Sequence, residues 1–283
     1  MFEANWLLST SAYWHPMRSR NPDSGKVLDN FVEGTTFKEA TDLYTFDGRL
    51  RLIMLDALER LEVSFRTEVA LSLGKHDPKA HRKLEHLGQG FAKPKYRGGP
   101  TKHREWVQRL DKKALKSGDQ FAVHFRTKYP SEDMPVWIAV ELLDFGPLSH
   151  LIGGMSNSDL SLVGQDYGGL KPDIIKSWAR SLAFTRNVCA HHSRLWNKPL
   201  VNQPALMGKA LPRELVHIQR LADGGKRLYS IAAVAQYLLQ VANPRTSWKS
   251  RFVSHIRTFP ASPRFSLRSA GFPEGWERND LWK

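Results

Sequence analysis

The sequence predicts a mainly α-helical fold, a bundle of several helices that carries a basic insertion. Apolar residues recur at steps of three and four over long stretches of the chain, which is the pattern of amphipathic helices. The long alternating stretches that would indicate a sheet are missing from the sequence. Of the 283 residues, 41% are hydrophobic and 25% are charged, an ordinary composition for a protein with a buried core.

The clearest helix is predicted over residues 49–73. Its apolar stripe is formed by Leu50, Ile53, Leu55, Leu58, Leu61, Phe65, Val69 and Leu73. Gly74 is typical of the position just beyond a helix end. Glu62 and Arg66 stand four residues apart on another face of this helix, which predicts an ion pair between them.

The chain before this helix contains signals for a turn and for a helix start. Residues 22–25 have the composition of a turn, and Thr36 and Glu39 have the spacing of a capping box. Residues 42–49 are polar and contain Gly48, and the long helix is predicted to begin at residue 49.

We expect four parts along the chain. They are an N-terminal helical part at 1–74, a basic insertion of helices and loops at 75–133, a helical core at 134–243 and a basic tail at 244–283. Within the core, a helix over 135–152 is predicted to be interrupted near Gly146 and Pro147. Residues 212–222 and 226–242 predict a helical hairpin.

Positive charge is in large excess. The chain has 42 lysines and arginines against 28 acidic residues, a formal net charge of +14, and a sequence pI near 9.9. This excess indicates a polyanionic partner, either nucleic acid or an acidic membrane surface. Residues 75–128 hold 15 of the cations against five acids, with aromatic residues among them, which suits contacts with phosphates and bases.

Candidate nucleic-acid contacts follow from this distribution, although a solvated surface position is the simpler alternative for any one of them. In the insertion they are Lys93, Lys95, Tyr96, Arg97, Lys102, Arg104, Lys112 and Lys113. Residues 93–100 are rich in Pro and Gly and predict a mobile loop. Residues 243–273 contain six lysines and arginines and no acid, which makes Arg251 and Arg257 a second group of candidates.

The sequence also indicates the cellular compartment of the protein. No run approaches the ~18 apolar residues that a membrane-spanning helix needs, and the first residues lack the pattern of a secretory signal. Cys189 is the single cysteine, which fits a reducing compartment, and we interpret it as a buried, inert residue. We therefore expect a cytoplasmic protein without a membrane partner.

A second amphipathic helix, predicted to begin near Asp173 and to end before Pro199, carries the residues most suited to chemistry. Arg186, Asn187 and His191 form an Arg-Asn-x-x-x-His pattern. Asn187 and His191 share a face, and an imidazole beside a guanidinium suits proton transfer on a phosphodiester. The alternative is that cations near a helix C-terminus only complement its dipole.

Three stretches of the chain resemble the bacterial abortive-infection (Abi) phage-resistance proteins of the AbiD and AbiF type, whose C-terminal helical part belongs to the HEPN superfamily. The superfamily hallmark is Arg, a polar residue, a short spacer and His. The matching stretches are Phe46–Thr67, Met134–Leu148 and Arg186–Asn197, in the order that the family has them. Together they span most of the chain.

The resemblance implies a HEPN-like helical core and a metal-independent endoribonuclease that leaves 2′,3′-cyclic phosphate ends and needs no cofactor. It implies that His191 is the general acid or base, that Arg186 steadies the phosphate and that Asn187 orients His191 or the phosphate. Auxiliary residues at this site would be His192, Arg194, Glu62 and Arg66.

One motif supplies one histidine, whereas the reaction needs an acid and a base, so the resemblance also implies a homodimer with a composite site. The alternative is a non-catalytic RNA-binding effector that acts by sequestration or by recruiting a partner. Under either interpretation the partner is RNA, and a small structured RNA is a candidate regulator.

Two further expectations concern the N-terminus and metals. In the family, a stretch like residues 13–18 follows a longer helical region, so the resemblance implies that this chain is short at its N-terminus. Cys189, His191 and His192 lack the spacing of a zinc site, so no metal site is expected.

Overall fold

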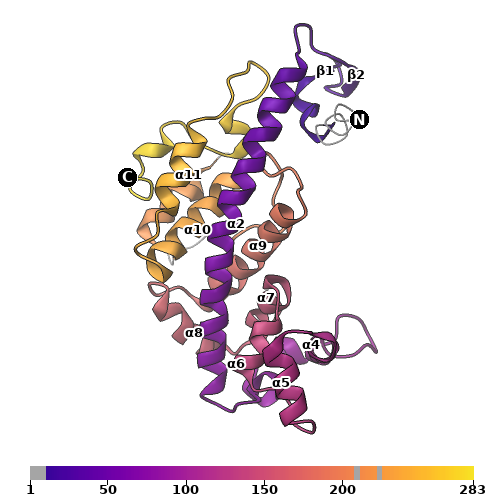
Figure 1. Ribbon diagram of the computed structural model, residues 1–283. Coiled ribbons are helices and arrows are strands. Elements are labelled where there is room, and N and C mark those ends of the chain that lie inside the picture. The colour runs from indigo at the N-terminus through magenta and orange to yellow at the C-terminus, as the bar shows by residue number, and fades with distance from the viewer. Residues whose placement is uncertain (1–10, 207–210, 222–224) are drawn as a thin grey trace.

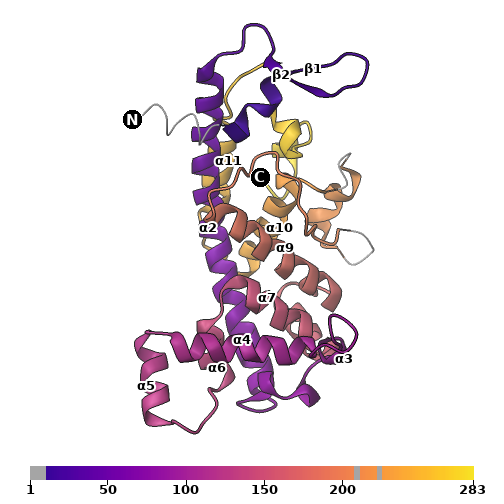
Figure 2. The same cartoon turned by 90° about the vertical axis from the view of Figure 1, so that its right-hand side faces the viewer.

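The long helix α2, Phe37–Gly74, is the axis of the fold. The computed structural model of the protein describes residues 11–206, 211–221 and 225–283, and these residues are mainly helical, as the sequence predicts. Helix α2 has 38 residues and runs through most of the length of the molecule (Figures 1 and 2). At 1.5 Å per residue it is ~57 Å long. The other helices are arranged along it.

The predicted start of this helix was wrong by twelve residues, because α2 begins at Phe37 instead of residue 49. The predicted capping box is confirmed: the Thr36 side chain accepts a hydrogen bond from the Glu39 N–H, and the Glu39 side chain accepts one from the Thr36 N–H. The stretch of residues 42–49 is helical because one of its faces is buried, at Leu43, Phe46 and Asp47. This packing outweighs the ~1 kcal/mol that Gly48 costs inside a helix.

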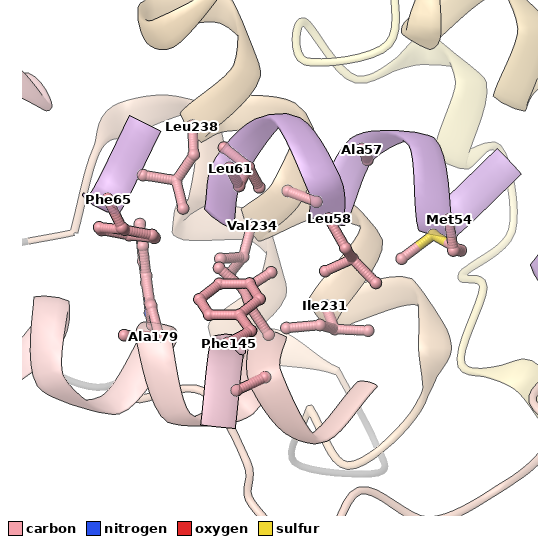
Figure 3. Packing of buried hydrophobic residues seen from close by; sticks show 14 of the residues in the cluster. Met54, Ala57, Leu58, Leu61, Phe65, Phe145, Ala179, Ile231, Val234 and Leu238 are labelled. Atoms are coloured by element: carbon pink, nitrogen blue, oxygen red, sulfur yellow. The ribbon is translucent and has the colours of Figure 1, made fainter. Parts of the chain in front are cut away.

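Three helices build the main core against α2. They are α7 (Phe145–Gly154), α9 (Pro172–Ala190) and α10 (Leu228–Ala242). Figure 3 shows the central part of this core, formed by Met54, Ala57, Leu58, Leu61, Phe65, Phe145, Ala179, Ile231, Val234 and Leu238. Each large apolar side chain buried here stabilises the fold by ~1.5–3 kcal/mol. Helix α8 (Asn157–Asp166) also packs on α2 and α9.

The N-terminal segment covers one end of α2. It consists of two short 3₁₀ helices and an antiparallel hairpin, namely η1 (Ser11–Tyr13), η2 (His15–Met17), β1 (Arg18–Arg20) and β2 (Val27–Phe31). The predicted turn at residues 22–25 joins the two strands, and Gly25 adopts the left-handed conformation there. Figure 2 shows the hairpin beside the start of α2.

The basic insertion and the start of the core lie around the other end of α2 (Figures 1 and 2). Their elements are η3 (Ala80–Arg82), η4 (Leu84–His86), α3 (Gln89–Ala92), α4 (Lys102–Lys116), α5 (Gln120–Lys128), α6 (Val136–Ala139) and η5 (Val140–Leu142). The helix interruption predicted near Gly146 and Pro147 lies earlier, at residues 143–144. Gly146 and Pro147 are themselves helical, because both fit the first turn of α7.

The predicted helical hairpin is an α-helix only in its second arm, α10. The first arm is the 3₁₀ helix η6 (Arg213–Arg220), and most of the predicted junction lies outside the described residues. Twelve of the fifteen residues of α10 are buried, because this helix is surrounded by other elements.

The C-terminal residues pack back onto α2 through α11 (Trp248–Ile256), followed by η7 (Leu267–Ala270) and η8 (Trp276–Arg278). The Trp248 indole donates a 2.7 Å hydrogen bond to the Ile53 carbonyl, and His255 stacks on Phe46. In the described part of the chain, no helix combines the length and the apolar character needed to cross a membrane.

Candidate active site

Helix α9 carries the Arg-Asn-x-x-x-His motif at its C-terminal end. The helix begins with Pro172 in its first turn and ends at Ala190, so His191 is its C-cap rather than an interior residue. The backbone then closes with the two hydrogen bonds of a Schellman motif, from the His192 N–H to the Cys189 carbonyl and from the Ser193 N–H to the Val188 carbonyl.

His192 adopts the left-handed conformation in this turn, with φ of 54°. It is the one non-glycine residue with positive φ among the residues that the structure describes. Glycine usually occupies this position of the motif, and a residue with a side chain is strained there. The turn leaves the side chains of His191 and His192 exposed.

The segment that follows is held in place by Asp47 of α2. The buried Asp47 carboxylate accepts hydrogen bonds from the backbone N–H groups of Leu195 (3.0 Å) and Trp196 (2.7 Å). The Trp196 side chain is itself buried. The end of the motif is therefore fixed to the helix that runs through the molecule.

The same carboxylate also binds two side chains. It accepts a 2.5 Å hydrogen bond from the Tyr13 hydroxyl and a 2.7 Å bond from Arg51, and Arg51 donates to the Tyr13 oxygen at 2.9 Å. Burial raises the pKa of the Tyr13 hydroxyl far above its ordinary value, and the Asp47 charge raises it further. Asp47 thus joins the N-terminal segment, α2 and the chain after α9.

Arg186 projects toward a second buried carboxylate on α2, that of Glu62, about three turns of helix beyond Arg51. Its Nε lies 3.9 Å from the Glu62 carboxylate, whose other oxygen accepts a 2.5 Å hydrogen bond from Arg66. Arg66 also donates to the Leu143 carbonyl at 2.7 Å and lies 3.6 Å from the Glu141 carboxylate. The structure therefore brings Glu62 and Arg66 to Arg186.

Burial is the largest influence on the Glu62 carboxyl and raises its pKa above the ordinary value. The cations Arg66 and Arg186 oppose this effect, and the Asp144 charge adds to it. Two guanidinium groups thus share one buried carboxylate, which limits the directions in which Arg186 can point.

Asn187 and His191 lie on the exposed side of this arrangement. The side-chain amide oxygen of Asn187 accepts a 3.4 Å hydrogen bond from the Arg186 guanidinium. The backbone carbonyl of Asn187 accepts a 3.0 Å hydrogen bond from the His191 N–H. One surface of the α9 end therefore presents a guanidinium, an amide and an exposed imidazole. Such a set can bind a phosphate and move a proton.

A surface hollow of about 630 Å³ adjoins the motif on its other side. Its lining comes from the N-terminal segment and the chain after α9, namely Ala12, Tyr13, His15, His192, Ser193, Arg194 and Lys198. Arg194 also donates a hydrogen bond to the Ala12 carbonyl, which closes one wall. The hollow is therefore rich in cationic and titratable groups.

The family model described as Abi-like protein matches residues 6–197. The chain belongs to the Abi-like protein family. No curated protein and no solved structure matches it. Membership of the family supports a role in abortive infection, a form of phage defence.

The Abi-like match ends at Asn197, the last residue of the motif segment. It therefore contains Asp47, Glu62 and the α9 motif, whereas α10, α11, Arg251 and Arg257 lie beyond it.

Sequence reasoning missed His15 and Lys198 in the hollow of this Abi-like protein. The signal for His15 is its place in the stretch of residues 13–18, which resembles the family. It missed Asp47 as well, because an aspartate in a polar stretch gives no sign of its distant partners.

Cys189 is buried, as predicted, at 1% exposure. Burial raises the pKa of its thiol to about 12, and the nearby Asp47 charge adds to the effect. The thiolate is scarce at neutral pH, so this cysteine is an inert part of the core. Within the described ranges, no group of three or more His, Cys, Asp or Glu side chains could hold a metal ion.

The candidate nucleic-acid contacts fall into two classes in the structure. Several are in ion pairs with acidic side chains, namely Lys95 with Glu105, Lys113 with Asp144, Arg251 with Asp56 and Arg257 with Glu277. Others are exposed and form no ion pair with the residues that the structure describes, namely Lys93, Arg97, Lys102, Arg104 and Lys112. Tyr96 is 63% exposed in the same region.

Proposed function

We propose that this Abi-like protein is a metal-independent endoribonuclease of the HEPN type that acts in abortive infection. The observation that supports it most is the Arg186–Glu62 ion pair, which directs this guanidinium at the α9 end that also carries the exposed Asn187 and His191. Ion pairs with a buried carboxylate hold an arginine in one direction, which is what a group that binds a reacting phosphate needs.

RNA suits this arrangement because it carries its own nucleophile. A base removes the proton of the 2′-hydroxyl, the oxygen attacks the neighbouring phosphorus, and the bond to the 5′-oxygen breaks. An acid gives its proton to that leaving oxygen. The products are a 2′,3′-cyclic phosphate and a 5′-hydroxyl, and DNA, which lacks the 2′-hydroxyl, is not cleaved.

In this proposal His191 transfers the proton and Arg186 stabilises the negative charge on the non-bridging phosphate oxygens. Asn187 lies within reach of Arg186 and orients it or the phosphate. His192 and Arg194, which line the adjoining hollow, contact the next phosphate of the chain. Glu62 and Arg66 act through Arg186 and are positioning residues.

The reaction needs an acid and a base at once, whereas each chain offers one His191. A homodimer that places two α9 ends together would supply both groups in one composite site. Activity per mole of protein should then fall on dilution below the dissociation constant of the dimer, and a size measurement by light scattering would detect the change of mass.

The exposed cations of the insertion provide the surface that holds the RNA. Lys102, Arg104 and Lys112 lie on α4, and Lys93 and Arg97 lie in the loop before it. Binding through such groups weakens steeply with salt, because each neutralised phosphate releases counterions.

The test is cleavage of labelled RNA and of matched DNA in the presence of EDTA. Wild-type protein should cut RNA alone and leave cyclic phosphate ends, and Arg186→Ala and His191→Ala should abolish cutting while RNA binding persists. His124→Ala, which removes an exposed histidine of α5, is the matched control and should cut normally. Normal cutting by His191→Ala would exclude the proposed site.

A second candidate is a non-catalytic RNA-binding effector. The exposed cations favour it as much as they favour the nuclease, because they require only binding. Tight binding of RNA by wild type and by both variants, without cleavage by any of them, would support the effector.

A further inference from the structure

A second concave site lies between the basic insertion and the core, away from the Arg186–His191 motif. Its volume is about 330 Å³, within the range of small-molecule sites. It is lined by α3, the loop after α3, α4, α7 and α9, elements that meet beside the lower half of α2 in Figure 2. The lining residues include six polar ones: Lys95, Lys102, Glu105, Arg109, His150 and Arg180.

Four of these six residues are cations, from three different elements. Lys95 and Arg109 both approach Glu105, at 2.8 and 3.8 Å, so the single carboxylate of the lining is already compensated. Lys102 and Arg180 form no ion pair with the part of the chain that the structure describes. The pocket therefore keeps an excess of positive charge.

The floor of the pocket is aromatic and rigid. Phe91 and Trp106 are 6% and 5% exposed, and their ring centroids lie 6.2 Å apart. The Trp106 indole donates a 2.9 Å hydrogen bond to the Pro147 carbonyl, which ties α4 to α7. A Cβ at Gly154 would lie 2.2 Å from the Phe91 ring, so glycine is needed there for α3 to pack against α7.

His150 lies at the edge of the same pocket. Burial lowers the pKa of its imidazole, and the positive charges of Arg109, Arg180 and Lys95 lower it further. These three cations line the pocket together with His150, so their charges would also act on an anion bound there. A neutral imidazole there offers one hydrogen-bond donor and one acceptor.

We propose that this pocket binds a nucleotide, with its phosphate between Arg180, Lys102 and Arg109 and its base or sugar against the aromatic floor. Guanidinium and ammonium groups are the usual protein ligands of phosphate, and an aromatic surface accepts any nucleobase. The ligand is either a free mononucleotide or the phosphorylated end of an RNA chain, since both present the same groups.

This site is separate from the proposed active site, although α9 contributes to both. Arg180 precedes Arg186 by six residues, a rise of ~9 Å and a rotation of ~240° around the helix. The proposal therefore does not depend on cleavage. His191→Ala should bind the nucleotide as wild type does, whether or not the protein proves to be a ribonuclease.

Isothermal titration with AMP, ATP, adenosine and inorganic phosphate at about 0.15 M salt tests the proposal, since nonspecific attraction is screened there. AMP or ATP should bind, and adenosine should bind at least ~10-fold more weakly, because it lacks the charge-assisted bonds to phosphate. A parallel titration compares a short RNA with a 5′-phosphate against the same RNA with a 5′-hydroxyl. A preference for the phosphorylated RNA over AMP would identify the RNA end as the ligand.

Two variants locate the binding. Arg180→Glu should weaken it at least ~10-fold. Lys171→Glu is the matched control, because Lys171 is the exposed N-cap residue of α9, nine residues before Arg180, and does not line the pocket. Gly153→Leu fills the pocket without a change of charge, and a Cβ at Gly153 meets no atom within 4 Å, so this variant should fold and lose binding.

Three results would overturn the proposal. They are an absence of binding for AMP, ATP and the phosphorylated RNA alike, equal binding of AMP and adenosine, and equal weakening by Arg180→Glu and Lys171→Glu. Loss of binding in Arg180→Glu and Gly153→Leu, with Lys171→Glu unchanged, would establish the site.

Discussion

The Asp47 carboxylate accepts a 2.7 Å hydrogen bond from the backbone N–H of Trp196, a residue 149 positions later in the sequence. This bond, with those from the Leu195 N–H and the Tyr13 hydroxyl, connects the two ends of the family match through one buried charge. The motif at the end of α9 is therefore positioned from outside its own helix.

Replacement of Asp47 should destabilise the protein strongly. Asp47→Ala leaves the Arg51 guanidinium buried without its partner and removes the acceptor of two backbone N–H groups. Breaking a buried ion pair in this way costs ~3–5 kcal/mol. Urea unfolding measures the loss. Asp42→Ala, which removes an exposed partner of Lys38 on the same helix, should change stability by less than ~1 kcal/mol. Equal effects of the two variants would contradict the role of Asp47.

Local sequence pattern was sufficient to predict the helical fold, the capping box at Thr36 and the Glu62–Arg66 ion pair, because each depends on residues within four positions of one another. The start of α2 was misjudged for the same reason. The polar residues 42–49 are helical because Asp47 and its neighbours have buried partners elsewhere in the chain.

Long-range pairing also decides which cations are available. Arg251 and Arg257 lie in a stretch of sequence without acidic residues, so the sequence predicts no ion pair for either. In the fold, Arg251 meets Asp56 of α2 and Arg257 meets Glu277. Charge along the sequence measures total attraction for a polyanion, whereas the interface depends on which charges the fold leaves unpaired.

The contribution of Glu62 to stability should fall as the pH rises. Folding raises the pKa of its carboxyl, so its contribution is present in full below the ordinary pKa of 4.5 and is lost as the pH rises through the raised pKa of the folded state. The unfolding free energy of wild type minus that of Glu62→Gln should therefore decrease between about pH 4 and about pH 7. Glu59→Gln, an exposed position on the same helix, should show no such trend. An increase of the difference with pH would refute the prediction.

His192→Gly should stabilise the protein, because glycine adopts positive φ without strain. The expected gain is ~0.5–1 kcal/mol, since the greater freedom of glycine in the unfolded chain offsets part of the relieved strain. His192→Ala removes the same imidazole but keeps a Cβ in the strained conformation, so it should be the less stable of the two variants. Thermal unfolding of both variants gives the order. If alanine proves at least as stable as glycine at this position, the backbone strain is not significant.

Exposed and paired arginines should differ in their effect on RNA affinity. Arg104 lies exposed on α4, whereas the Arg257 guanidinium is held 2.9 Å from the Glu277 carboxylate and would have to leave that ion pair to reach a phosphate. Arg104→Ala should weaken binding of single-stranded RNA and lower the slope of log affinity against log salt by ~1, the value for one lost phosphate contact. Arg257→Ala should leave that slope nearly unchanged. Titrations at several salt concentrations measure both slopes, and a larger change for Arg257→Ala would place the RNA on the C-terminal segment instead of the insertion.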